Sequence, residues 1–159
     1  MTQQKTRPKI MAVVRNTGRI PQWETITAAI NGRDAGVLIQ EMVKGSRELV
    51  VGLTRDPQFG PCVMFGLGGI FTEILKDVSF RLAPLEKVDA MDMMRDIQGR
   101  KILDAVRGME KVDREALATI LINVGRLGID HERIKEIDIN PLVIRGKDPV
   151  AVDALIILN

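Results

Sequence analysis

The stretch that decides the fold runs from Ile134 to Leu158 and reads IKEIDINPLVIRGKDPVAVDALIIL. Its first part alternates the polar residues Glu136, Asp138 and Asn140 with isoleucines. In an extended strand successive side chains point to opposite faces, so the three polar side chains share one face and the isoleucines share the other. Turn-forming residues at 145–149 and a second apolar run complete the pattern of a β-hairpin.

This hairpin predicts a cluster of oxygen ligands. If its centre lies between Gly146 and Lys147, Asp153 is opposed to Asn140 on the same face, with Cβ atoms about 5 Å apart. The carboxylates of Asp138 and Asp153 then converge with one amide oxygen. All-oxygen ligand sets suit hard cations such as Mg²⁺, which would neutralise the repulsion between carboxylates. The alternative is an exposed polar strand face with Asp153 at a sheet edge, and a register slip of one residue would favour it.

The rest of the chain predicts strands and two helices without regular alternation. Apolar or β-branched runs predict strands at residues 10–14, 35–43, 48–54, 62–65 and 71–82. Helical spacing predicts helices over 85–97 and 113–127, with Asp113 as N-cap of the second helix and Gly128 at its end. The predicted apolar stripe of the first helix comprises Val88, Met91, Met94 and Ile97. We therefore expect an α/β fold in the broad sense, or α+β, with a mainly antiparallel sheet and flanking helices.

The composition is that of a globular protein of ordinary charge. The 159 residues are 45% hydrophobic and 28% charged with a formal net charge of +2, so no strong field selects a polyanionic partner. One Trp, four Phe and no Tyr leave few faces for stacking on nucleic-acid bases. The sequence has no apolar run of membrane-spanning length, and its single cysteine, Cys62, cannot form an internal disulfide. We expect a soluble cytoplasmic protein without nucleic-acid or membrane partners.

Two further features could face a phosphate group. The cluster Gly66-Leu67-Gly68-Gly69 could present backbone N–H groups closely, although it has the spacing of neither a Walker loop nor a dinucleotide fingerprint. A tight turn is the alternative. Arg55 could place a cation at the rim of a cleft, and its alternative is a turn closed by Pro57.

Six ordered runs carry a family resemblance: VLIQEM from Val37, GLTRDPQFGP from Gly52, MFGLGGIF from Met64, EILKDVSFRLAPL from Glu73, EIDINPL from Glu136, and AVDAL from Ala151. They closely resemble the β subunit of NDP-forming acyl-CoA synthetases over residues 35–158. The resemblance implies the C-terminal lobe of an ATP-grasp domain, related to that of succinyl-CoA synthetase. It also implies the reaction of acyl-CoA, ADP and phosphate to acid, CoA and ATP.

The resemblance implies roles for individual residues. Asp138 and Asn140 match the family's acid-x-Asn metal element, and Asp153 matches its second metal-binding strand, so that the cofactors would be Mg²⁺ and ATP or ADP. The adenine would lie against the backbone of a hinge formed by Gln40, Glu41, Met42 and Val43. Phosphate-facing groups would be Arg55, Gly66, Gly68 and Gly69.

Residues 1–34 depart from that family. They form a basic segment without histidine, whereas the family places there a lobe with a nucleotide-binding lysine and a phosphoryl-carrying histidine. We expect residues 35–159 to be the ATP-grasp lobe and the chain alone to be inactive. Its expected partners are a CoA-binding α subunit or domain and the other ATP-grasp lobe, in an oligomer. The alternative is a truncated, non-catalytic module that binds nucleotide or another subunit.

Overall fold

The computed structural model describes residues 11–15, 36–69, 77–106 and 108–159. The chain divides into two compact units, Met1–Met42 and Val43–Asn159. In the first unit β1 (Met11–Arg15) and β2 (Gly36–Gln40) form a two-stranded parallel sheet, with Met11 opposed to Gly36. β2 is shorter than the strand predicted over 35–43, because residues 41–43 are described and lie outside any strand.

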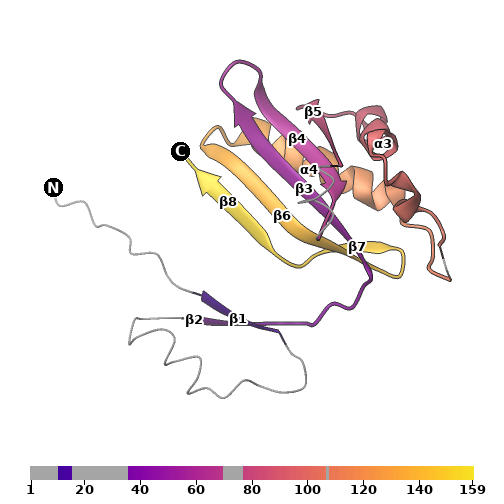
Figure 1. Cartoon of the computed structure of the whole chain (residues 1–159). Helices are drawn as coiled ribbons and strands as arrows, with labels where there is room; N and C mark the ends of the chain where they lie inside the picture. The colour runs from indigo at the N-terminus through magenta and orange to yellow at the C-terminus, as the bar shows by residue number, and fades with distance from the viewer. Residues whose placement is uncertain (1–10, 16–35, 70–76, 107) are drawn as a thin grey trace. The chain divides into compact units, whose positions relative to one another are not determined.

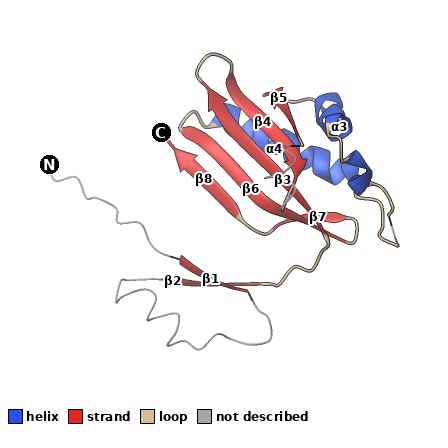
Figure 2. Cartoon of the chain, in the orientation of Figure 1, coloured by secondary structure: helices blue, strands red, loops and turns tan. Residues whose placement is uncertain are grey.

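The described residues of the second unit form a six-stranded antiparallel sheet with the two α-helices α3 and α4 on one face (Figures 1 and 2). Its strand order is β5-β4-β3-β6-β7, and β8 also pairs with β6. The predicted fold class, a mainly antiparallel sheet with flanking helices, is therefore confirmed. The elements in chain order are β3 (Arg47–Asp56), β4 (Gly60–Leu67), β5 (Val78–Leu82), α3 (Lys87–Asp96), the short 3₁₀ helix η1 (Arg100–Leu103), α4 (Arg114–Asp130), β6 (Ile134–Arg145), β7 (Asp148–Ala151) and β8 (Ala154–Leu158).

Strand register assigns each side chain to one of two sheet faces. Val51 in β3 is opposed to Phe65 in β4 and to Ile139 in β6, and opposed residues share a face. This helix face packs against α4 over β3 and β4 and against α3 over β5. Gly52, the next residue, is opposed to Asp138 on the other side of the sheet. We call that side the acidic face.

The helix face holds the hydrophobic core. Its strand residues are almost fully buried, and they pack with apolar residues of both helices. The largest fully buried side chains include Phe65, Leu49, Leu53, Met93, Met94, Ile97, Leu117 and Leu121. Burial of this size is the main favourable term that holds such a sheet and its helices together.

α4 begins as its sequence predicts, whereas α3 begins at Lys87, two residues after the predicted start, and its buried positions differ in part from the prediction. Asp113 caps α4, because its carboxylate accepts the N–H groups of Glu115 and Ala116 at 3.1 and 3.0 Å. On α3 the predicted stripe is wrong at Val88, which is 57% exposed. Residues spaced strictly by three drift around a helix of 3.6 residues per turn. The α3 face that packs on the sheet consists of Ala90, Met93 and Met94.

Gly128 does not end α4 as predicted, because the helix continues to Asp130. A Cβ at Gly128 would lie 2.4 Å from Cδ1 of Leu53 and 2.9 Å from Cβ of Pro61. The glycine therefore serves the close approach of α4 to the sheet. No helix in the described part of the chain is both long and apolar enough to span a membrane.

Candidate functional site

The register of the closing hairpin agrees with the sequence-based pairing. β6 pairs with β7 from Arg145 opposite Asp148 onward, and with β8 through Asp138 opposite Leu155. Between these two ladders the backbone N–H of Asn140 donates to the carbonyl oxygen of Asp153 at 3.2 Å. Asn140 and Asp153 are therefore opposed as the hairpin predicted.

A β-bulge lies at the same place and was not predicted. Between the pairs Leu49 with Leu142 and Val51 with Ile139, β3 contributes one residue and β6 contributes two. The two β6 residues are Asn140 and Pro141, and proline has no N–H to give to a ladder. Bulges bend a strand and redirect side chains, and they are frequent beside active sites. The sequence signal for this bulge was the proline within an otherwise continuous strand pattern.

The electrostatics of the site centre on Asp138. Partial burial raises the pKa of the Asp138 carboxyl, and the nearby carboxylates of Glu136 and Asp153 raise it further. Negative charges near one another disfavour the ionised form of each, because their repulsion is relieved by a bound proton or a cation. The effect of Asp153 on the pKa of Asp138 shows that the two carboxylates lie within electrostatic range of each other.

The donor set fits Mg²⁺ in number and kind. No three His, Cys, Asp or Glu side chains are positioned to share a metal ion in the part of the chain that the structure describes. The candidate set is instead two carboxylates, from Asp138 and Asp153, and the amide of Asn140. Mg²⁺ usually takes one or two carboxylates and completes its shell with water and substrate phosphates, so this set is sufficient. One oxygen of Asp153 already accepts the N–H of Ala154 at 2.9 Å, which holds that carboxylate at the start of β8.

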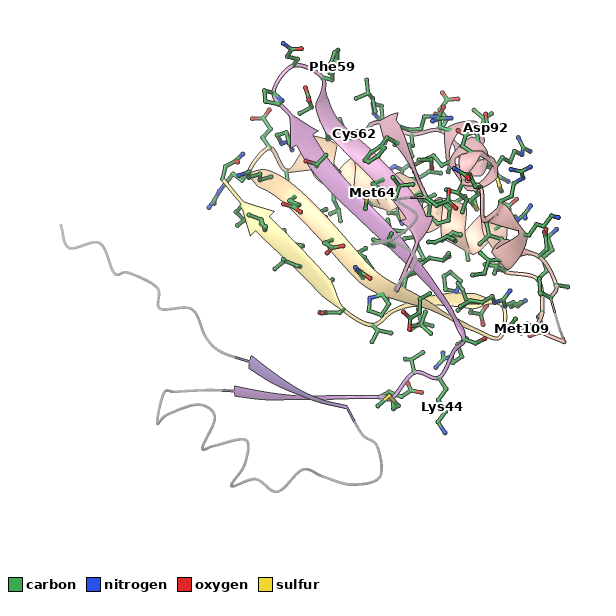
Figure 3. All side chains as sticks on the ribbon, viewed as in Figure 1. Lys44, Phe59, Cys62, Met64, Asp92 and Met109 are labelled. Atoms are coloured by element: carbon green, nitrogen blue, oxygen red, sulfur yellow. The ribbon has the colours of Figure 1, made fainter. Side chains whose placement is uncertain are left out.

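Gly52 contributes to the site and was missed in the sequence. It is opposed to Asp138 on the acidic face, and a Cβ there would lie 3.2 Å from both the carbonyl oxygen of Ile137 and Cε of Met64. Glycine at this position leaves the surface next to Asp138 without a side chain from β3. Met64 and Cys62, labelled in Figure 3, project from β4 on the same face. A lone glycine inside a strand pattern is the signal that could have identified it.

Arg55 lies on the helix face, away from Asp138. Its guanidinium donates to three carbonyl oxygens where α4 ends, those of Gly128 at 2.6 Å, His131 at 3.2 Å and Ile134 at 2.9 Å. A cation at the C-terminus of a helix satisfies unpaired carbonyls and complements the helix dipole. Arg55 also lines a cleft of about 670 Å³ beside the β3–β4 turn. Its contact with phosphate stays a prediction, and the structure supports a role in the fold.

The glycine cluster is used largely for close backbone packing. A Cβ at Gly66 would lie 2.7 Å from the carbonyl oxygen of Asp77, and one at Gly68 would lie 2.9 Å from the backbone of Glu48. The N–H groups of Leu67 and Gly68 donate to the carbonyl oxygens of Asp77 and Glu48. Gly69 has a positive φ of 64°, as a turn requires. These contacts agree with the turn alternative, and the phosphate cradle stays a prediction.

The predicted adenine hinge crosses the boundary between the two units. Gln40 ends β2, Met42 ends the first unit and Val43 begins the second. The hinge therefore stays a prediction.

Comparison with known proteins supports the motif-based resemblance. The family model described as ATP-grasp domain matches residues 22–158. The β subunit of an ADP-forming acetate–CoA ligase I from Pyrococcus furiosus is 55% identical over 123 residues, which are 77% of this chain and 53% of that one. The β subunit of ligase II from the same organism is 49% identical over 127 residues, or 78% of this chain and 54% of that one. The chain thus spans about half the length of these two curated relatives.

A solved structure agrees with these matches. Dinucleotide-forming acetyl-coenzyme A synthetase 1 of Candidatus Korarchaeum cryptofilum, in complex with coenzyme A and Mg-AMPPCP, is 51% identical, with a TM-score of 0.72. The match covers 76% of this chain and 56% of that chain. The resemblance inferred from the six sequence runs is confirmed, and so is the fold that it implied.

Proposed function

Because the chain belongs to the ATP-grasp domain family, we propose that it forms one wall of a Mg²⁺–nucleotide site in an ADP-forming acyl-CoA synthetase. Asp138, Asn140 and Asp153 hold the cation, and the backbone of residues 40–43 lies against the adenine. Mg²⁺ held there would neutralise charge on the nucleotide phosphates, which is the chemistry it supplies in phosphoryl transfer. The overall reaction converts acyl-CoA, ADP and phosphate into acid, CoA and ATP.

The observation that carries this proposal is the opposition of Asn140 and Asp153 beside Asp138. Their backbones are joined by a hydrogen bond, so the distance between these side chains is set by the ladder and its bulge. Partial burial and then the carboxylates of Glu136 and Asp153 raise the pKa of Asp138, so a bound cation would favour the ionised carboxylate there. A divalent ion with two carboxylates and a polyphosphate reaches charge balance at such a surface, so metal and nucleotide are expected to bind together.

The residues of this chain position the cation and leave other tasks to partners. Arg55 is engaged with helix carbonyls, so the positive groups that grip the nucleotide phosphates come from another lobe or subunit. The relatives named as β subunits support an assembly with a CoA-binding α subunit or domain. In this arrangement the chain alone binds nucleotide weakly and does not turn over acyl-CoA.

A second candidate is a non-catalytic module that binds a nucleotide or another subunit. The exposed apolar residues on two sheet edges favour it, among them Phe80 and Leu82 on β5 and Leu155 on β8. Contiguous exposed apolar surface on a small protein is typical of an interaction site. The two candidates share the metal site and differ in whether a completed assembly has synthetase activity.

Titration with Mg²⁺ and ADP tests the site directly. Backbone amide NMR shifts should move around Asp138 and Asn140 only when both ligands are present, with a dissociation constant on the order of 1 mM, or about 4 kcal/mol. Asp153→Asn keeps the shape of the side chain and one acceptor oxygen but removes its charge, so it should weaken the metal-dependent part of binding. Asp148→Asn is the matched control, because it makes the same change on the same hairpin at the exposed start of β7. Shifts that map elsewhere, or equal titrations for both variants, contradict the proposal.

A further inference from the structure

The outer edge of β8 is a second candidate binding surface, and it is apolar and exposed. β8 (Ala154–Leu158) lies at one edge of the sheet, drawn in yellow in Figure 1, and among the described strands it pairs with β6 alone. α4 packs mainly on β3 and β4, with a few contacts on β6 and β7, and α3 packs mainly on β5, so neither helix covers β8. Both faces of β8 consequently reach the surface.

The side chains of β8 are apolar and exposed. Leu155, Ile156, Ile157 and Leu158 have exposed fractions of 57%, 52%, 38% and 53%. Natural sheets protect an edge strand with a charged residue, a proline or a bulge that twists the edge away. β8 has neither a charge nor a proline within its five residues. Such an edge is a template for pairing with another strand.

The ladder with β6 determines which backbone groups of β8 point outward. On either side of β8, the N–H of Asn140 donates to the carbonyl oxygen of Asp153 and the N–H of Asn159 donates to the carbonyl oxygen of Arg133, so residues 153 and 159 face β6. Bonded positions alternate along an antiparallel strand, so 155 and 157 also face β6, while 154, 156 and 158 face outward. Ile156 is thus the central outward residue of the strand.

We propose that β8 pairs in antiparallel fashion with β8 of a second copy of this chain, about a two-fold axis at Ile156. The axis must lie perpendicular to the sheet, so opposed residues come from the same face in both copies. Ile156 then opposes itself and Leu155 opposes Ile157, which both lie on the acidic face. This register overlaps all five residues and places the outward-bonding Ile156 at the hydrogen-bonded centre.

A second copy fits this edge because the strand is neutral and complementary to itself. Every opposed pair in the register joins two apolar side chains, and no like charges meet within β8. Two five-residue strands make a small interface, below that of a stable dimer, so the association is weak and concentration-dependent. The joined sheet carries both acidic faces on one side. The inference rests on β8 and holds whether or not the site binds Mg²⁺.

Sedimentation of matched variants tests the surface. The chain should shift with rising concentration from its monomer mass of 17.7 kDa to twice that mass. Ile156→Lys places two ammonium groups side by side at the axis, and we expect at least a tenfold rise in the dimer dissociation constant. Leu127→Lys makes the same change at another exposed apolar position, on α4, and should leave dimerisation unchanged. A chain that is monomeric at all concentrations, or a dimer equally sensitive or insensitive to both variants, overturns the proposal.

Disulfide trapping gives a second test that does not depend on a destabilised variant. In a hydrogen-bonded pair the Cα atoms are about 5.5 Å apart, within the range that a disulfide spans. Ile156→Cys in a Cys62→Ala background should therefore give a covalent dimer on mild oxidation. Leu155→Cys in the same background should not, because residue 155 opposes 157 in the partner copy. Equal trapping of both variants, or trapping of neither, shows that a different surface or a different chain occupies the edge.

Discussion

The two faces of this sheet are built from the same strands and differ in what they leave unsatisfied. On the helix face Val51, Phe65 and Ile137 are at most 4% exposed, and Arg55 meets three carbonyl oxygens. On the acidic face Asp138 lies near two other carboxylates, and its pKa is raised. The buried apolar side chains of the first face favour the folded state, whereas partial burial on the second face disfavours the ionised carboxylate of Asp138. Residues that cost stability without a ligand are typical of a functional site.

The largest expected difference between the faces concerns two phenylalanines on neighbouring strands. Phe65 on β4 is 0% exposed on the helix face, and Phe80 on β5 is 48% exposed on the acidic face. Phe65→Ala should lower the free energy of unfolding by about 3–5 kcal/mol, because it removes packed atoms and leaves a cavity. Phe80→Ala should lower it by less than about 2 kcal/mol, because much of that ring already meets water. Denaturant unfolding of both variants measures the difference, and equal losses would contradict the assignment of faces.

The second comparison concerns two arginines. Arg55→Lys keeps the charge but cannot reach three carbonyl oxygens in different directions, so we expect a loss of about 1.5–3 kcal/mol in unfolding free energy. Arg81→Lys alters an exposed ion pair with Asp96 and should cost less than about 1 kcal/mol. Thermal unfolding compares the two. If Arg55→Lys is as mild as Arg81→Lys, the guanidinium does not hold the end of α4 and becomes available for another role.

The smallest expected effect is a gain in the free energy of unfolding, on replacement of Asp138 by asparagine. The folded chain raises the pKa of Asp138 above its ordinary 3.8, so the folded state binds this proton more tightly than the unfolded state. Stability is thus fully present below the ordinary pKa and lost as the pH rises through the raised one. Asp138→Asn should stabilise the unliganded chain at neutral pH by less than about 1 kcal/mol, since Asp138 is only partly buried and solvent also screens its repulsion by Glu136 and Asp153.

The control for Asp138→Asn is to measure its stability relative to wild type at low pH as well. Near pH 3 wild-type Asp138 is protonated, so the stability difference between the two chains should vanish. Denaturant unfolding at both pH values measures it. A stabilisation that persists unchanged at low pH would show that shape, and not charge repulsion, distinguishes the variant. A destabilisation at neutral pH would show that the carboxylate has a partner in the fold.

Prediction from sequence succeeded where the pattern is local. The alternation of residues 136–140 and the turn at Gly146 were sufficient to oppose Asn140 to Asp153, because strand period and turn position together set a register. Asp113 was identified as an N-cap, because a cap forms with the residues that follow it. Of the strand predicted over 71–82, residues Val78–Leu82 form β5 and Asp77 lies just before it, whereas residues 71–76 lie outside the described chain, so that part stays a prediction.

Other features depended on contacts between distant segments. Gly128 resembled a helix end in sequence, but Leu53 and Pro61 require a glycine there within the helix. The role of Arg55 could not be inferred from its neighbours, because its three partners lie more than 70 positions along the chain. The position of Gly52 opposite Asp138 and the bulge at residues 140–141 both follow from the pairing of β3 with β6, which the sequence did not show.

The sequence by itself determined the hairpin, its register and the family, because these depend on side-chain periodicity and on runs of adjacent residues. Tertiary structure decided which face of the sheet is covered and which is acidic. It also decided that Arg55 belongs to the fold and that β8 is an edge. The physical reason is that burial, pKa and edge exposure are sums over neighbours in space, and antiparallel pairing brings together residues far apart in sequence.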